Sequence, residues 1–327
     1  MKKDNLLIIT PVNHIDKFIS EAKKFFRLKI LKNPKQSELK KNIKDTKYIF
    51  TNPNMTQIYL GKKLLKNTDV KAICTASTGT IHIDEKYCKK QNIKVLSLKN
   101  DKNFLNQLTS TSDLAFGFLI NAVRKIPQST LSVSKGKWSY LDFKGRMIKN
   151  LQIGIIGYGR LGKIFTKYCL CFGSKVSVYD PFVKITNKKI EVIKNINKEI
   201  KKLDVLALHI HASKKNLNFI NKKKLNLMKE NIIIINTSRG EIIEENDLIS
   251  FLRKNKKSIY FTDVLSREYD GLNKSKIFNY SKKNPNQVFI TPHIGGMTIE
   301  GQSLAYHYSL KKLKIFSKKW LKQKKNF

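Results

Sequence analysis

Three short segments in the second half of the chain carry side chains that can do chemistry. Arg239 lies in Asn-Thr-Ser-Arg-Gly, Glu268 follows a Thr-Asp-Val segment, and His293 lies in Thr-Pro-His-Ile-Gly-Gly. Each segment comes at the end of a short apolar run, which we interpret as a buried strand. Ligands of open α/β sheets bind just beyond the carboxyl ends of the strands. The three segments therefore predict one site.

An Arg, a carboxylate and a His together supply what hydride transfer at a 2-hydroxy acid requires. The guanidinium of Arg239 can hold a substrate carboxylate through two hydrogen bonds. His293 can take the hydroxyl proton as hydride leaves and return it in reduction. A carboxylate such as Glu268 on the other ring nitrogen fixes the tautomer and favours the protonated ring. Each residue alone also fits a structural role, but beside a dinucleotide-binding loop the three favour catalysis.

The stretch 151–181 predicts such a loop. An apolar run is followed by Gly157, Gly159 and Gly162 in GxGxxG spacing, then by a helix-like segment, a second apolar run and Asp180. Gly157 allows a tight turn, Gly159 lets the backbone approach a pyrophosphate, and Gly162 lets the helix pack closely. Asp180 follows at about the 20-residue spacing expected of a ribose-binding carboxylate, which favours NAD over NADP. The alternative is a glycine turn in another kind of α/β sheet.

Apolar runs alternate with helix-compatible segments along the whole chain, which predicts parallel sheets. We expect an α/β protein with two Rossmann/flavodoxin-like domains, the dinucleotide-binding domain being inserted into a discontinuous substrate domain. Residues 103–126 predict one long helix ended by Pro127, and residues 128–150 predict a loop. The tail 301–327 predicts a helix docked on the first domain, with a basic membrane-surface helix as the alternative. The predicted strands cover residues 6–10, 28–31, 48–51, 70–75, 93–96, 151–156, 175–179, 205–209, 232–236, 258–264 and 288–291.

The composition limits the partners and the compartment. The 327 residues contain 65 Lys and Arg against 24 Asp and Glu, a net charge of +41. Such a charge invites a nucleic-acid interpretation, but the lysines are spread along the whole chain, so we expect no specific nucleic-acid partner. The four cysteines lack metal-binding spacing, which predicts a reducing compartment and no metal. No apolar run reaches the length of a signal peptide or a membrane span, so we expect a cytoplasmic protein and no membrane partner.

Taken together, the motifs resemble those of the D-isomer-specific 2-hydroxyacid dehydrogenases, the group that includes D-3-phosphoglycerate dehydrogenase. The resemblance extends from about Val70 to Thr298 and includes the strand that leads to His209. It implies an NAD-dependent dehydrogenase in which Arg239 binds the substrate carboxylate, Glu268 orients the imidazole and His293 is the acid/base. The expected cofactor-binding residues are Gly157, Gly159, Arg160, Leu161, Gly162, Asp180, Thr237, Ser238, Asp263, Gly295 and Gly296.

The resemblance also implies a substrate loop and a domain arrangement. Ser77, Thr78 and Gly79 would bind the substrate carboxylate through backbone amides, together with Arg239. The substrate domain would comprise residues 1–102 and 298–327, and the NAD-binding domain residues 103–297. Members of the family usually pair through the dinucleotide domain, so we expect a homodimer.

Two departures from the family's pattern stand out. Position 211 is His where the family usually has Pro, which we interpret as a tolerated replacement. Ile81 and His82 occupy positions that are often Asp-Asn, which leaves the substrate open. The substrate class is a 2-hydroxy or 2-keto acid, with 3-phosphoglycerate as one candidate and glyoxylate, hydroxypyruvate or a sugar-derived acid as the alternative. A non-catalytic NAD-binding regulator is a further possibility, which the acid/base pair argues against.

Overall fold

The computed structural model describes residues 3–53 and 58–325. The chain folds into two compact units, and each is described by itself. Unit 1 contains Met1–Leu108 and Met297–Phe327, and unit 2 contains Thr109–Gly296. The sequence placed the first boundary after residue 102. It lies later because helix α5 (Lys102–Leu105) buries Phe104 and Leu105 in the core of unit 1.

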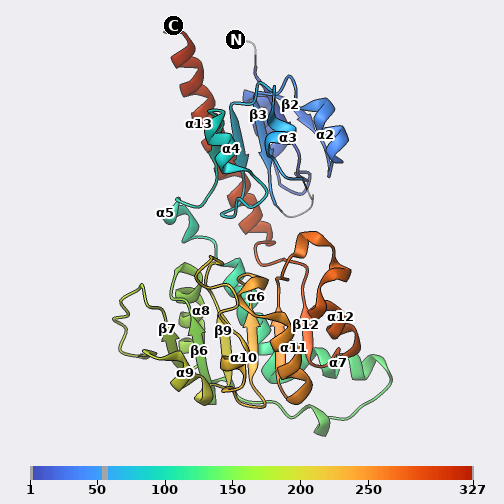
Figure 1. Ribbon diagram of the computed structural model, residues 1–327, viewed down its shortest axis with the longest axis vertical. Helices are drawn as coiled ribbons and strands as arrows, with labels where there is room; N and C mark the ends of the chain where they lie inside the picture. Colours follow the sequence, from blue (N-terminus) through green and yellow to red (C-terminus); the bar gives the residue numbers. More distant parts are fainter. Residues whose placement is uncertain (1–2, 54–57, 326–327) are drawn as a thin grey trace. The chain divides into compact units, whose positions relative to one another are not determined.

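Unit 1 is built on a five-stranded parallel sheet in the order β2-β1-β3-β4-β5 (Figure 1). This is the flavodoxin-like order of a doubly wound fold. Neighbouring residues of β1 point to opposite faces, and both faces are buried, which explains the unbroken apolar run. Leu6 and Ile8 pack in one core, whereas Leu7 and Ile9 pack in the other. The strands are β1 (Asn5–Ile8), β2 (Arg27–Ile30), β3 (Tyr48–Thr51), β4 (Ala72–Thr75) and β5 (Lys94–Leu96).

Helices cover both faces of this sheet. The first core is closed by α1, α5 and α13, and the second by α2, α3 and α4. The C-terminal helix α13 (Ile299–Lys325) buries Tyr306, Leu310 and Leu313 against β3 and β4, so the tail docks on unit 1 as expected. Leu304 of the same helix is exposed. The other helices are α1 (Phe18–Phe25), α2 (Gln36–Asn42), α3 (Lys62–Leu65) and α4 (Glu85–Lys90).

Unit 2 is built on a seven-stranded parallel sheet in the order β12-β11-β10-β9-β6-β7-β8. The chain starts in the middle at β6 and reverses direction between β6 and β9, as in the doubly wound dinucleotide-binding fold. Helices α6 and α8 cover one face, and α9 to α12 cover the other. The strands are β6 (Gln152–Ile156), β7 (Lys175–Tyr179), β8 (Ile190–Val192), β9 (Val205–Leu208), β10 (Ile233–Asn236), β11 (Ile259–Thr262) and β12 (Val288–Ile290). The sequence analysis did not predict β8, a three-residue edge strand.

The predicted single helix over 103–126 was wrong. The segment forms α5 and then α6 (Ser110–Arg124), because Phe104 and Leu105 belong to the core of unit 1 and Leu119 to that of unit 2. Pro127 does not end the helical region either. It lies in the first turn of α7 (Ile126–Ser134), where its missing N–H costs nothing, so part of the predicted loop is helical. The remaining α-helices of unit 2 are α8 (Arg160–Cys171), α9 (Ile196–Glu199), α10 (Lys222–Leu225), α11 (Glu245–Lys254) and α12 (Lys276–Lys283).

Candidate active site

The glycine loop connects β6 to α8 at the point where the sheet order reverses. Gly157 has φ +98°, and a Cβ there would lie 2.6 Å from the carbonyl oxygen of His209. A Cβ at Gly162 would collide with the carbonyl oxygen of Gly157. Both positions therefore need glycine. The Cβ position of Gly159 faces open space, so a ligand can approach the backbone at the start of α8.

Asp180 follows β7 and lies beside this loop. Its Oδ2 accepts a hydrogen bond from the N–H of Tyr158 at 2.7 Å, and its Oδ1 accepts one from the N–H of Phe182 at 2.9 Å. A carboxylate has about four acceptor sites, so capacity remains for ribose hydroxyls. Two buried polar groups, one directly after β9 and one directly after β10, also favour a ligand here. The Oγ1 of Thr237 and the Nε2 of His209 are buried without a hydrogen-bond partner among the described residues.

Burial dominates the environment of His209. It lowers the pKa of the imidazole to about 4, so the ring is neutral at physiological pH. The ring packs against Phe165 of α8, with 4.9 Å between the ring centroids. The sequence analysis used His209 only as the end of a strand. Only the tertiary structure shows that the backbone of His209 lies against Gly157. Together, the glycine loop, Asp180 and the two unpartnered groups fit a bound dinucleotide.

His293 and Glu268 form a direct pair in unit 2. Nδ1 of His293 lies 2.8 Å from Oε1 of Glu268, so the ring donates from Nδ1 and its Nε2 is available for substrate. Burial acts to raise the pKa of Glu268, but the hydrogen bond and charge of His293, a backbone hydrogen bond at Leu265 and the charge of Arg239 outweigh it. The pKa of Glu268 is therefore below its usual range, and the side chain is a carboxylate.

Asp263 anchors the loop that carries His293. Its Oδ1 accepts hydrogen bonds from the hydroxyl of Thr291 (2.5 Å) and the N–H of Ile294 (2.7 Å), and its Oδ2 accepts one from the N–H of Gly295 (2.7 Å). Burial raises the pKa of Asp263 against these hydrogen bonds. His293 itself has φ +56°, an uncommon conformation for a residue other than glycine. The three hydrogen bonds hold the loop in this conformation.

Gly295 and Gly296 end the same loop. A Cβ at Gly295 would lie 2.9 Å from Oδ2 of Asp263, so a side chain here would have to displace that carboxylate. The carbonyl oxygen of Gly295 accepts a hydrogen bond from the hydroxyl of Thr111 on α6 at 3.0 Å. The Cβ position of Gly296 faces open space. At the other loop, the carbonyl oxygen of Leu161 accepts a hydrogen bond from Ser112 of α6 at 3.0 Å. Helix α6 thus braces both loops.

Arg239 leaves β10 through a turn that Asn236 holds. Oδ1 of Asn236 accepts hydrogen bonds from the N–H (3.0 Å) and the hydroxyl (2.7 Å) of Ser238, and its Nδ2 donates to the carbonyl oxygen of Arg239 at 3.0 Å. Arg239 donates from Nη1 to the carbonyl oxygen of Ser238 at 2.6 Å. The sequence analysis quoted Asn236 only as part of a motif. An Asn side chain can both accept and donate hydrogen bonds, so an Asn at the end of a strand is a sequence signal for a residue that stabilises a turn.

The predicted substrate loop lies in unit 1, after β4. The hydroxyl of Ser77 donates to the carbonyl oxygen of Gly79 at 2.7 Å, and the hydroxyls of Thr75 and Ser77 are 2.9 Å apart. Within residues 3–53 and 58–325, the N–H groups of Thr78, Gly79 and Thr80 donate to no protein acceptor. Successive unpaired amides are suited to binding an anion.

The two residues that depart from the family's pattern lie in different environments. Ile81 is exposed, whereas His82 is buried, and burial lowers its pKa to about 4. Neither ring nitrogen of His82 has a partner in the described part of the chain. His211, the other departure, has an exposed position after β9.

Two further properties concern metals and membranes. Among the described residues, no three His, Cys, Asp or Glu side chains come together as potential metal ligands. None of the helices in the described ranges combines the length and the apolarity needed to cross a bilayer.

A seven-stranded doubly wound sheet with a glycine loop at its switch point defines a dinucleotide-binding protein, and comparisons with known proteins identify the family. The chain matches the model of the D-isomer specific 2-hydroxyacid dehydrogenase NAD binding domain over residues 116–295. It matches the model of the catalytic domain of the same family over residues 6–104. The chain therefore belongs to the D-isomer-specific 2-hydroxyacid dehydrogenases, a family of NAD-dependent oxidoreductases.

Relatives in this family carry different substrate names. A D-3-phosphoglycerate dehydrogenase of Methanocaldococcus jannaschii is 30% identical over 247 residues, which are 73% of this chain but only 44% of that protein. A hydroxypyruvate reductase of Thermotoga maritima is 30% identical over 72% of this chain and 73% of its own length. A glyoxylate reductase of Thermococcus litoralis is 28% identical over 92% of this chain and 90% of its own length.

Solved structures share the fold over the whole chain. The D-lactate dehydrogenase from Aquifex aeolicus, complexed with NAD and lactic acid, has a TM-score of 0.80 and 27% identity, covering 99% of this chain and 98% of that one. The NAD⁺-bound 3-phosphoglycerate dehydrogenase of Entamoeba histolytica has a TM-score of 0.76 and 26% identity, covering 97% and 96%.

Proposed function

We propose that the protein interconverts a D-2-hydroxy acid and its 2-keto acid, with His293 as the acid/base. The 2.8 Å pair between His293 and Glu268, in the unit that carries the dinucleotide loop, is the observation that supports this most directly. A purely binding protein has no need of a carboxylate that fixes the tautomer of a half-exposed imidazole. This pair therefore argues against a non-catalytic regulator.

The residues divide the work of the reduction as follows. Bound NADH supplies a hydride to the carbonyl carbon. His293 gives its Nε2 proton to the carbonyl oxygen, so that hydride and proton together make the hydroxyl group. Glu268 keeps Nδ1 protonated and stabilises the charged ring before the proton leaves. Arg239 binds the substrate carboxylate and polarises the neighbouring carbonyl. In the oxidative direction His293 takes the hydroxyl proton back.

The cofactor-binding roles are likewise proposals. Asp180 would accept hydrogen bonds from the adenosine ribose, and Gly157, Gly159, Arg160, Leu161 and Gly162 would surround the pyrophosphate at the start of α8. Thr237 and Ser238 would line the nicotinamide side, and the unpartnered Oγ1 of Thr237 supports this. Gly295 and Gly296 belong to the loop of His293, and Asp263, which follows β11, would act by holding that loop. Unit 2, Thr109–Gly296, would form the NAD-binding domain.

In unit 1, we assign the amides of the Ser77-Thr78-Gly79 loop to the substrate carboxylate, because the N–H groups of Thr78 and Gly79 donate to no protein acceptor in the described residues. Unit 1, Met1–Leu108 and Met297–Phe327, would form the substrate domain. Glyoxylate, hydroxypyruvate and 3-phosphohydroxypyruvate are the candidates that the names of the relatives suggest. The four cysteines are free thiols, which suits a reducing compartment and the cytoplasm. We also propose that the protein is a homodimer.

A substrate panel tests this function. NADH oxidation is followed by absorbance with 3-phosphohydroxypyruvate, hydroxypyruvate, glyoxylate and pyruvate, and NADPH is run in parallel. We expect turnover of at least one 2-keto acid with NADH. His293→Ala should lower kcat by ~10²-fold or more, the usual contribution of a positioned acid/base, while NADH still binds. Normal turnover by this variant would contradict the acid/base role, and failure of all four acids would contradict the proposed substrate class.

A further inference from the structure

The first turn of helix α6 carries two neighbouring hydroxyl groups that reach two different loops of unit 2. The hydroxyl of Thr111 donates to the carbonyl oxygen of Gly295 in the loop of His293, at 3.0 Å. The hydroxyl of Ser112 donates to the carbonyl oxygen of Leu161 in the glycine loop, also at 3.0 Å. Successive residues of an α-helix point about 100° apart, so one turn can reach both loops at once. The two loops are thus joined through two consecutive residues of one helix.

Helix α6 is itself fixed on unit 2 by polar and aromatic contacts. The hydroxyl of Tyr168 on α8 donates to Oδ1 of Asp113 at 2.7 Å. The ring of Phe116 lies against that of Tyr168, with 5.6 Å between the ring centroids. Further along the helix, Phe118 contacts Phe261 of β11, with 5.2 Å between the ring centroids. The start of α6 is therefore tied both to the helix that follows the glycine loop and to a strand of the sheet, so it can serve as a fixed point for both loops.

The backbone of Gly295 is held on both sides. Its N–H donates to Oδ2 of Asp263 at 2.7 Å, and its carbonyl oxygen accepts the hydrogen bond from Thr111. A Cβ on Gly295 would lie 3.2 Å from Cγ2 of Thr111, so the methyl group packs against the same residue. One hydrogen bond lets a residue pivot, whereas bonds to both its N–H and its C=O fix its backbone. His293, two residues earlier, has φ +56°, a conformation that persists only where the surrounding structure determines it. Thr111 is therefore part of what holds this loop.

Reduction of a 2-keto acid needs such a link between the loops. The hydride must reach the carbonyl carbon while the proton reaches the oxygen bonded to it, so the two donors need a fixed relative position. The glycine loop would hold the dinucleotide that carries the hydride, and His293 would carry the proton. We propose that Thr111 and Ser112 are positioning residues, which set the loop of His293 relative to the bound dinucleotide. This role rests on the proposed function, because it concerns two transfers to one carbonyl group.

Two variants of Thr111 separate the effect of its hydroxyl from that of its bulk. Thr111→Val keeps the shape but removes the donor, so kcat for reduction should fall by about tenfold or more. The Kd for NADH should stay the same, since the glycine loop keeps its own contacts. Thr111→Ser keeps the donor and should restore most of the lost kcat. Steady-state kinetics and fluorescence titrations with NADH measure both constants. A wild-type kcat in the Val variant, or no rescue by Ser, would overturn the role of Thr111.

The link through α6 also predicts how two substitutions combine. Because Thr111 and Ser112 act in series, breaking either hydrogen bond disconnects the two loops. Ser112→Ala should therefore lower kcat as Thr111→Val does, and the double variant should lower it no further than the stronger single variant. Independent roles would instead multiply the two losses. Thr166→Val is the matched control, because Thr166 of α8 is a buried residue whose Oγ1 has no hydrogen-bond partner among the described residues. Multiplied losses, or an equal loss in the control, would contradict the link.

Hydrogen exchange measures the position of the loop without turnover. In Thr111→Val the backbone amides of Ile294 and Gly295 should exchange about fivefold faster than in the wild type, which is the effect of one lost hydrogen bond. In Thr111→Ser and Thr166→Val they should exchange at the wild-type rate. Unchanged exchange in Thr111→Val would overturn the proposal. If the wild type reduces no 2-keto acid, the proposed function fails, and the exchange rates by themselves decide whether Thr111 holds the loop.

Discussion

Asp263 shows how a side chain acquires a role from partners that the sequence does not reveal. The motif resemblance placed it among the cofactor-binding residues. In the structure its carboxylate accepts three hydrogen bonds from the loop of His293. Those partners lie 28 to 32 residues further along the chain, and only the pairing of β11 with β12 brings them near. Asp263 is therefore a residue that positions the loop of His293.

Glu268→Gln tests the charge of the other partner of His293. Gln keeps the size of the side chain but removes the negative charge that favours the protonated ring. The alkaline limb of the pH–rate profile for reduction should therefore move to lower pH, and kcat at neutral pH should fall by about tenfold or more. Steady-state reduction rates between acid and alkaline pH measure both effects. If the alkaline limb of the variant lay at the same pH as that of the wild type, the charge of Glu268 would not influence the protonation of the acid/base.

The segment 103–134 shows why long helices are hard to place from a sequence. The apolar residues of 103–126 predict one helix, but they serve two cores. Phe104 and Leu105 pack in unit 1, and Leu119 packs in unit 2. One straight helix cannot supply both cores, so the chain breaks between α5 and α6. Lys125 then takes a left-handed conformation, with φ +51°, and starts α7.

Asp204, directly before β9, accepts hydrogen bonds from three other segments of the chain. Its lowered pKa should make the stability of the fold depend on pH. Burial acts to raise its pKa, but hydrogen bonds from Arg146, the N–H of Gln152 and Lys229 lower it to about 2. Because the pKa of Asp204 is lower in the folded protein than its ordinary value of 3.8, the ionised carboxylate stabilises the fold at pH values above 3.8. This contribution is lost as the pH falls towards 2. The loss amounts to about 2 kcal/mol.

Asp204→Asn should remove this pH dependence. Near pH 6 the variant should be less stable than the wild type by about 2 kcal/mol or more, because Arg146 and Lys229 lose their counter-charge. The difference should shrink towards pH 2. Urea unfolding at several pH values measures it, and Asp16→Asn, at an exposed position, is the control. A constant difference across this range would mean that the ionised carboxylate is not the source of the stability.

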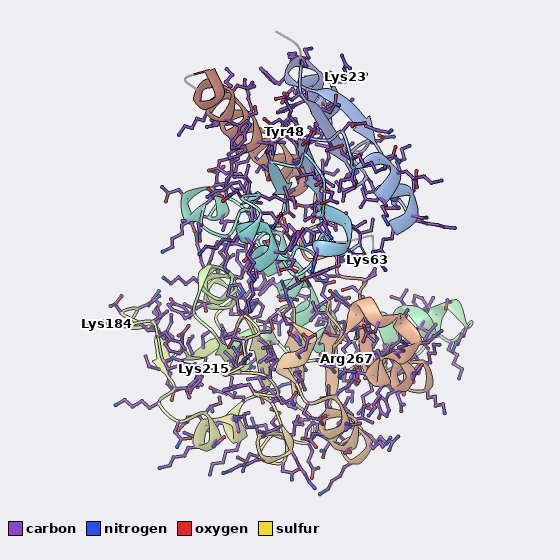
Figure 2. The ribbon with its side chains drawn as sticks, turned by 45° about the horizontal axis from the view of Figure 1, so that its top comes forward. Lys23, Tyr48, Lys63, Lys184, Lys215 and Arg267 are labelled. Carbon is purple, nitrogen blue, oxygen red and sulfur yellow. The ribbon has the colours of Figure 1, made fainter. Side chains whose placement is uncertain are left out.

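The net charge of +41 belongs to the molecule as a whole. Lysine side chains cover both units, as Lys23 and Lys63 of unit 1 and Lys184 and Lys215 of unit 2 illustrate in Figure 2. They are spread over the surface and not gathered on one element. Such a distribution attracts polyanions through counterion release alone, without reading a sequence.

Binding to duplex DNA should therefore be weak and strongly dependent on salt. We expect the affinity to fall by on the order of 10³-fold between about 50 and 200 mM salt, with no preference among sequences. Fluorescence anisotropy with two unrelated duplexes in a salt titration measures this. Salt-resistant binding to one of the duplexes would reveal a specific nucleic-acid site and contradict the present interpretation.

By itself, the sequence determined the features that depend on local patterns. Apolar runs predicted eleven of the strands. Central strands such as β3, β4, β9 and β10 are buried on both faces and are therefore apolar at nearly every position. The GxGxxG spacing predicted the loop after β6, because the backbone at Gly157 and the close contact at Gly162 exclude a Cβ. The strand-end segments predicted Glu268 and His293 as site residues, and Nδ1 of His293 lies 2.8 Å from Oε1 of Glu268.

Only the tertiary structure decided the features that depend on which distant segments meet. It chose the partners of Asp263, placed His209 behind the glycine loop and divided the segment 103–126 between two cores. A hydrogen bond or a buried face needs a second surface, and the position of that surface is set by the folding of the entire chain. The local spacing of residues in the sequence does not specify the position of that second surface.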